Sequence, residues 1–125
     1  MKLHTGIITK QIQESKKFYT EVLDFEIKFE SEWFILLNVK NKPNNELALM
    51  LPNQTQTRKT YFQEEYQKGI WFILEVESIK NYYEKIKTKK VKIDLELTEE
   101  EWGDIHFTIL DPNGIGIDIV EERKS

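Results

Sequence analysis

Hydrophobic and polar residues follow two periods along this chain, and the order of these periods occurs twice. Residues 3–9 form a short β-rich segment, after which apolar positions recur at helical spacing over residues 11–23. Three further segments, at residues 25–30, 33–39 and 46–51, carry the alternation or the continuous apolar run of strands. The first part of the chain is therefore predicted to be strand, helix and three strands. The predicted buried stripe of the helix consists of Ile12, Ser15, Tyr19, Val22 and Leu23.

The second part of the chain repeats this order. A strand is predicted at residues 70–76, and an amphipathic helix follows, with Ser78 at its N-cap and apolar positions at Ile79, Tyr82, Tyr83 and Ile86. Further strands are predicted at residues 91–97, 105–110 and 115–120, with a proline-containing turn at residues 111–114.

The repeat divides the chain into two βαβββ units. Moving the sequence against itself by 67 residues places His4 on Trp71. We expect the first unit at residues 1–52, the second at residues 69–125, and a polar connection at residues 53–68, of which 61–67 are compatible with a short helix. Because 125 residues suffice for one domain and hardly for two independent ones, both units are expected to form a single α+β domain.

Composition and charge exclude several classes of function. The chain has no cysteine, which excludes disulfides, thiolate metal sites and cysteine nucleophiles. Its net charge of −4 makes nucleic acid an unfavourable partner. No apolar run approaches the roughly 20 residues that cross a bilayer, and the first residues lack the pattern of a secretion signal. We therefore expect a cytoplasmic protein without a nucleic-acid or membrane partner.

Four motifs follow one another at characteristic distances, at residues 15–25, 76–79, 102–103 and 111–118. In this order they resemble the vicinal oxygen chelate superfamily, which includes glyoxalase, bleomycin-resistance proteins and extradiol dioxygenases. The resemblance implies that each unit folds into a curved mixed sheet, that the two sheets form a cupped cavity, and that the helices pack outside. Asp24 stands where this family usually has glycine.

Alternation along the strands then predicts which side chains face the cavity. If Ile117 and Ile119 pack under a helix, Asp118 and Val120 point into the cavity. The same parity places Phe107 and Ile109 in the core. In the second unit the other predicted cavity-facing residues are Trp71, Ile73, Glu75, Trp102, Asp104, His106, Thr108 and Leu110. In the first unit they are His4, Gly6, Ile8, Ala48 and Met50, and the parity of Trp33 is open.

The resemblance also implies where a metal ion would bind. Metal-dependent relatives place one ligand on the first strand and one on the last strand of each unit, and the matching positions are His4, Ala48, Trp71 and Asp118. Alanine and neutral indole have no donor for a metal, whereas a catalytic divalent ion normally needs three protein ligands. We therefore expect no metal and no other cofactor. If Zn, Mn, Fe or Ni does bind, the expected ligands are His4 and Asp118, with a third from His106, Glu75 or a partner chain.

The other candidate chemistry at the cavity is aromatic. Tryptophan side chains there offer stacking area and an indole N–H to a planar or cationic ligand; alternatively, they fill the core or a dimer contact. The two histidines are either structural or supply a general base near neutral pH, although no accompanying nucleophile is identified. The candidate ligand-binding residues are His4, Trp33, Trp71, Trp102, His106 and Asp118.

Three functions are compatible with these residues, and the sequence leaves open whether the protein is an enzyme. The first is a small-molecule-binding protein like the bleomycin-resistance branch, without a catalytic metal and with an aromatic or cationic ligand. The second is a metal-dependent lyase, isomerase, transferase or dioxygenase of the same superfamily. The third is a structural or regulatory dimer without a ligand. A homodimer is expected because relatives cover their sheet edges and apolar rims by pairing subunits or by exchanging units between them.

Overall fold

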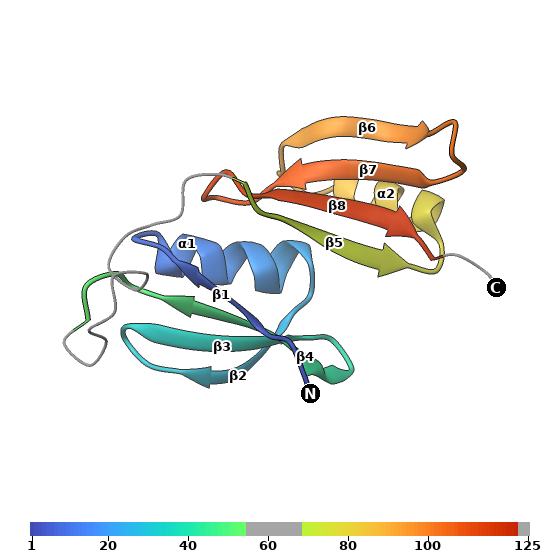
Figure 1. Cartoon of the computed structure of the whole chain (residues 1–125). Helices are drawn as coiled ribbons and strands as arrows, with labels where there is room; N and C mark the ends of the chain where they lie inside the picture. The colour runs from blue at the N-terminus through green and yellow to red at the C-terminus, as the bar shows by residue number, and fades with distance from the viewer. Residues whose placement is uncertain (55–68, 123–125) are drawn as a thin grey trace. The chain divides into compact units, whose positions relative to one another are not determined.

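The computed structural model describes residues 1–54 and 69–122. The chain divides into two compact units, Met1–Gln67 and Lys68–Ser125. In its described residues, each unit contains one four-stranded sheet and one α-helix, which confirms the predicted order of two βαβββ units (Figure 1). Apart from Asn53 and Gln54, the predicted connection at residues 53–68, with its short helix at 61–67, lies outside the described residues.

The first unit is built on a mixed sheet. Its elements are β1 (Thr5–Ile8), α1 (Ile12–Lys17), the π-helix η1 (Phe18–Val22), β2 (Glu26–Glu30), β3 (Phe34–Val39) and β4 (Lys42–Met50). The strand order is β1-β4-β3-β2, with β1 parallel to β4 and the other neighbours antiparallel. Helix α1 connects β1 to β2 and contacts β4. The buried apolar residues of this unit are Ile7, Ile12, Phe18, Tyr19, Leu23, Ile35, Leu37, Leu47, Leu49 and Met50.

Two details of the first unit differ from the prediction. The helix expected over residues 11–23 changes from α to π geometry at Phe18. Phe18, three residues after Ser15, is part of the buried stripe, whereas Val22 is only half-buried. Because a π turn contains more residues than an α turn, the phase of the stripe changes after Phe18. Strand β2, whose alternation predicts one buried face, is exposed along its whole length, and a register shift between Ile27 and Phe29 interrupts the alternation.

The second unit repeats the topology of the first. Its elements are β5 (Trp71–Val76), α2 (Ile79–Lys87), β6 (Ile93–Glu99), β7 (Ile105–Leu110) and β8 (Gly116–Glu121). The strand order is β5-β8-β7-β6, with β5 parallel to β8 and the other neighbours antiparallel.

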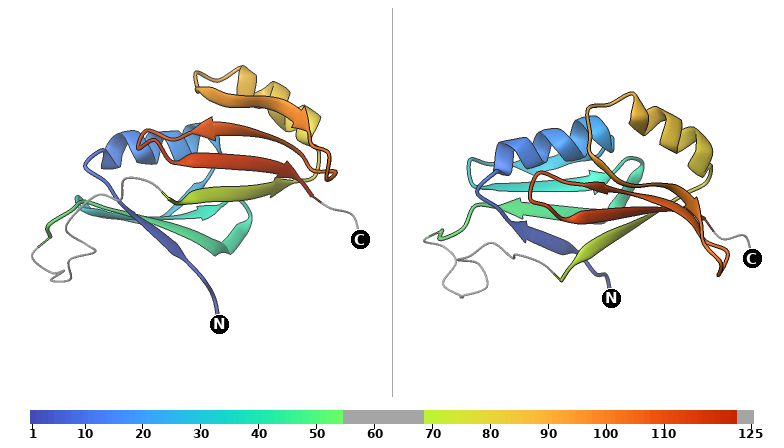
Figure 2. Two further views of the ribbon diagram at one scale, coloured as in Figure 1. Left: turned by 45° about the horizontal axis from the view of Figure 1, so that its top comes forward. Right: turned by 90° about the horizontal axis from the view of Figure 1, so that it is seen from above.

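Helix α2 covers one face of the second sheet and leaves the other face open. It contacts β7 and β8 and runs along one side of the strands (Figure 2). Tyr83 of the helix packs edge-on against Phe107, with ring centroids 4.9 Å apart. The side chains buried between helix and sheet are Ile79, Ile86, Phe107, Ile109, Ile117 and Ile119. Their burial confirms the predicted parity, so Asp118 and Val120 point away from α2.

Helix α2 begins after Ser78, as predicted, but the Ser78 hydroxyl does not cap the helix. In the described part of the chain, the Ser78 side chain makes no capping hydrogen bond. The Ile79 N–H instead donates to Oε1 of Glu121, at 3.5 Å. No helix among the described residues combines the length and apolar character that a membrane span requires.

Candidate functional site

The open face of the second sheet presents an aromatic and an aliphatic side chain beside a carboxylate. The register of the parallel strands β5 and β8 sets Trp71 opposite Gly116 and Ile73 opposite Asp118. Trp71 is 61% exposed and Ile73 is 58% exposed. Because side chains of a strand alternate between its two faces, these residues lie on the face away from α2. Trp71 and Asp118 were both predicted for this face.

On the same face, His106 lies between two carboxylates. Its Nδ1 is 2.6 Å from Oδ1 of Asp118 on β8, and its Nε2 is 3.1 Å from Oε1 of Glu100, which follows β6. The His106 side chain is only 14% exposed. We call this cluster the Glu100–His106–Asp118 triad; its side chains connect the β6–β7 hairpin to strand β8.

The geometry of the triad favours a protonated His106. A neutral imidazole has one N–H and can donate to only one of two carboxylates, whereas an imidazolium donates to both. The hydrogen bond to Asp118 raises the pKa of His106, burial opposes this effect, and the hydrogen bond to Glu100 and the charges of both carboxylates add to it. The protonated triad has a single net negative charge.

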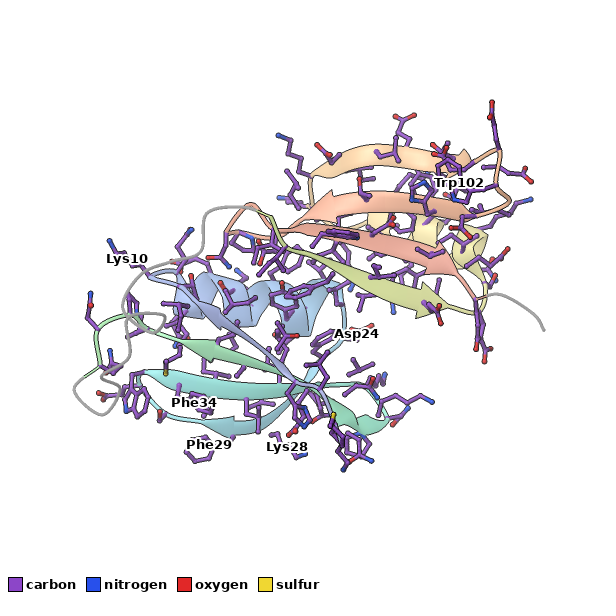
Figure 3. The ribbon with its side chains drawn as sticks, in the orientation of Figure 1. Lys10, Asp24, Lys28, Phe29, Phe34 and Trp102 are labelled. Carbon is purple, nitrogen blue, oxygen red and sulfur yellow. The ribbon has the colours of Figure 1, made fainter. Side chains whose placement is uncertain are left out.

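Trp102 lies in the turn that joins β6 to β7 (Figure 3), not on the strand face that alternation predicts. Its Nε1 donates to Oδ2 of Asp104, at 3.0 Å, and the residue is 67% exposed. Gly103 follows it with a φ of +99°. Side chains alternate between the two faces of a sheet only within extended backbone. Because Trp102 lies in the turn before β7, the alternation along β7 does not determine where its side chain points.

In the first unit, His4 contacts a carboxylate that is not among the predicted site residues. His4 precedes β1, and its Nδ1 is 3.2 Å from Oε1 of Glu46 on β4. The register sets Thr5 opposite Leu47, which places the two preceding residues side by side. Lys28 Nζ is 2.8 Å from Oε2 of the same carboxylate. The pKa of Glu46 is lowered mainly by the hydrogen bond that it accepts from Lys28. Burial of the carboxylate acts in the opposite direction, and the charges of nearby cations lower the pKa further.

Trp33 belongs to an aromatic group of the first unit. It precedes β3 and is half-buried. Its carbonyl accepts a hydrogen bond from the Leu51 N–H at 3.0 Å. Its ring centroid is 6.0 Å from that of Phe34, which is 6.2 Å from that of Phe29 on β2. Figure 3 labels Phe29 and Phe34 on these neighbouring strands.

Of the predicted site residues, the structure thus brings His106 and Asp118 into direct contact, and it adds Glu100 and Glu46. The sequence contained a signal for Glu46, because it lies two residues before Ala48 and shares its parity on β4. It contained none for Glu100, because β6 has two register shifts before the hairpin, and these remove the regular alternation on which such a prediction depends.

The residues present do not fit a metal ion at the four positions that the family resemblance implies. Ala48 and Trp71 provide no donor. Asp118 is hydrogen-bonded to His106, and both ring nitrogens of His106 are engaged with carboxylates. Ligation by this imidazole would require it to lose its proton and one of these contacts. Within residues 1–54 and 69–122, no group of three or more His, Cys, Asp or Glu side chains is arranged to hold a metal.

Comparison with known proteins identifies the family. The sequence model of the Glyoxalase/Bleomycin resistance protein/Dioxygenase superfamily matches residues 3–119, and the chain belongs to this superfamily. A comparison with curated proteins gave no match.

Solved structures of the superfamily share the fold. A member from Sphaerobacter thermophilus is 22% identical, with 98% of both chains covered and a TM-score of 0.75. A lactoylglutathione lyase from Agrobacterium tumefaciens is 12% identical, with 97% of this chain and 92% of that chain covered and a TM-score of 0.77. TioX from Micromonospora sp. ML1 is 9% identical, with 98% of this chain and 99% of that chain covered and a TM-score of 0.77. At these identities the likeness concerns the fold alone.

Proposed function

We propose that this superfamily member is a small-molecule-binding protein that takes an aromatic, cationic ligand on the open face of the second sheet, without a catalytic metal. The observation that carries the proposal is the accessibility of Trp71 and Ile73 beside the carboxylate of Asp118. Large apolar side chains that are grouped on one exposed face mark binding surfaces, whereas single ones need no explanation.

The chemistry of this face favours a ring with a positive charge. An exposed indole stacks on planar ligands, and its π face attracts a cation by about 0.5–2 kcal/mol. Glu75 continues the row of Trp71 and Ile73 on β5 and is exposed. Together with the net negative charge of the triad, it gives the face a potential that attracts cations and repels anions.

The contacts of His106 support binding rather than general-base catalysis. A general base must accept a proton at the pH of the reaction. The contacts with Asp118 and Glu100 raise the pKa of His106 and engage both of its ring nitrogens, so neither nitrogen is free to take a proton from a bound molecule. The donor set at the four implied metal positions likewise lacks a third ligand.

Ligand titrations test the proposal. We would titrate the protein with N-methylquinolinium, with the neutral N-methyl-2-quinolone of similar size, and with 2-naphthoate as an anion, and would follow binding by calorimetry and thermal shift. The cation should bind best, and Trp71→Ala should weaken it about tenfold. Trp102→Ala removes an equally exposed indole from the hairpin turn and should leave the affinity unchanged. No saturable binding of aromatic cations would refute the proposal.

A metal-dependent enzyme is the second candidate, and the pairing of His4 with Glu46 favours it. This contact places the imidazole of a histidine and a carboxylate side by side within the first unit. Metal analysis of protein purified without a chelator tests it. Stoichiometric Zn, Mn, Fe or Ni that is lost in both His4→Ala and Glu46→Gln would show a resident metal ion, as this candidate requires, and would overturn the metal-free first proposal.

We also propose that the protein is a homodimer. Strand β2 is at one edge of the first sheet, and Ile27 and Phe29 on it are exposed. Exposed apolar residues on a sheet edge favour pairing with another chain. Light scattering at micromolar concentration should give the mass of two chains, and Phe29→Glu should lower it. A monomeric mass of the unchanged protein would refute this proposal.

A further inference from the structure

We propose that Gly116 determines ligand specificity by forming the floor of a slot between Trp71 and Leu110, in which a flat ring lies with its positive end toward Asp118. This inference rests on the proposed function and assigns a defined position to the ligand on the open face.

The register of three neighbouring strands forms the slot. Gly116 on β8 stands opposite Trp71 on β5 and opposite Leu110 on β7. A Cβ built at Gly116 lies 3.8 Å from the Cβ of Trp71, which shows that both positions face the same side of the sheet. The central position of this row has no side chain, whereas its neighbours have an indole and an isobutyl group.

The dimensions of the row suit one aromatic ring. Trp71 and Leu110 stand two strand spacings apart, about 9.5 Å. A flat ring that contacts one side chain on each of its two faces needs about 7–8 Å between the facing carbon atoms of those side chains. A side chain at position 116 would occupy this space.

The next row of the sheet closes one end of the slot with a negative charge. Asp118 follows Gly116 on the same face, about 6.6 Å further along the strand. It stands between Ile73 on β5 and Thr108 on β7. A two-ring cation that lies along β8 would therefore reach the Asp118 carboxylate with its charged end.

The backbone does not require glycine at position 116. The φ angles of Gly103 and Gly114 are +99° and +81°, which other residues rarely adopt, but the φ of Gly116 is outside this left-handed region. The contact of 3.8 Å with Trp71 is an ordinary van der Waals distance. Glycine weakens a strand, and in strands it often marks a site where a ligand or another backbone approaches closely.

The test separates folding from binding. Gly116→Ala and Gly116→Val add bulk to the slot, and Val120→Ile adds one carbon to the same face of β8, two residues beyond Asp118. Affinity for N-methylquinolinium is measured by calorimetry and stability by urea unfolding. Both Gly116 variants should be as stable as the unchanged protein or more stable. Gly116→Val should weaken binding at least about tenfold and Gly116→Ala less, while Val120→Ile should stay within about twofold.

The outcomes distinguish this inference from the proposed function. If Trp71→Ala loses binding and Gly116→Val keeps it within about twofold, the slot is refuted and the proposed function stands. If the unchanged protein does not bind N-methylquinolinium or any other aromatic cation, the proposed function fails. A clear loss of stability in both Gly116 variants would show that the fold needs glycine there, and would also overturn the inference.

Discussion

His106 and Asp118 are joined diagonally across two strands, with Nδ1 and Oδ1 only 2.6 Å apart. In the register, His106 stands opposite Val120, and Asp118 stands opposite Thr108. Diagonal neighbours in a sheet are within reach of long side chains, and here the imidazole spans the distance. The short contact is typical of a hydrogen bond between charged groups.

The stability of the protein should depend on pH through His106. Its pKa is raised in the folded state, so the protonated triad stabilises the fold fully below the ordinary histidine value of about 6.5. This contribution is lost as the pH rises through the raised pKa. Urea unfolding from slightly acidic to mildly alkaline pH should therefore show a decrease in the free energy of unfolding. His106→Gln should remove this part of the decrease; an unchanged profile in the variant would contradict the assignment.

Asp118→Asn should affect both His106 and the ligand. The variant removes the largest cause of the raised pKa of His106, so the pKa should move toward its ordinary value, which an NMR titration of the imidazole measures. The affinity for N-methylquinolinium should fall by about tenfold, because a facing charge is lost. Glu100→Gln, at the other nitrogen, should lower the pKa of His106 less. Equal effects of both variants on the pKa would contradict the ranking of the two contacts.

Asp24 tests the backbone conformation of the turn after η1. Its φ is +58°, in the left-handed region that glycine adopts most easily. Asp24→Ala and Asp24→Gly both lose the carboxylate, so their difference isolates the backbone. The glycine variant should be more stable than the alanine variant by about 1 kcal/mol in urea unfolding. Equal stabilities would show that the turn relaxes to another conformation.

Asp111 should be essential for the turn that leads into β8. The residue is buried, and its Oδ1 accepts hydrogen bonds from the N–H groups of Asn113 and Ile115, both at 2.8 Å. Asp111→Ala leaves these donors without their acceptor and should lower the free energy of unfolding by about 2–4 kcal/mol. Asp111→Asn retains one acceptor oxygen and should cost less. A loss below about 0.5 kcal/mol for the alanine variant would contradict this role.

The sequence predicted the architecture correctly because local backbone geometry produces the periods on which the prediction rests. Within β7 and β8 the period of two placed Phe107, Ile109, Ile117 and Ile119 in the core and turned Asp118 away from α2. It predicted less well where the backbone leaves regular geometry. The π-helix η1, the bulge in β2 and the turn at Trp102 each shift the phase of the pattern.

The sequence by itself determined the order of the elements, the family resemblance and the faces of the regular strands. Only the tertiary structure decided which side chains meet: His4 with Glu46, and His106 with both Asp118 and Glu100. These partners are separated along the chain, and their contacts depend on strand register and hairpin geometry. Because a shift of one residue moves a side chain to the opposite face of a sheet, the polar and apolar pattern alone does not specify such pairs.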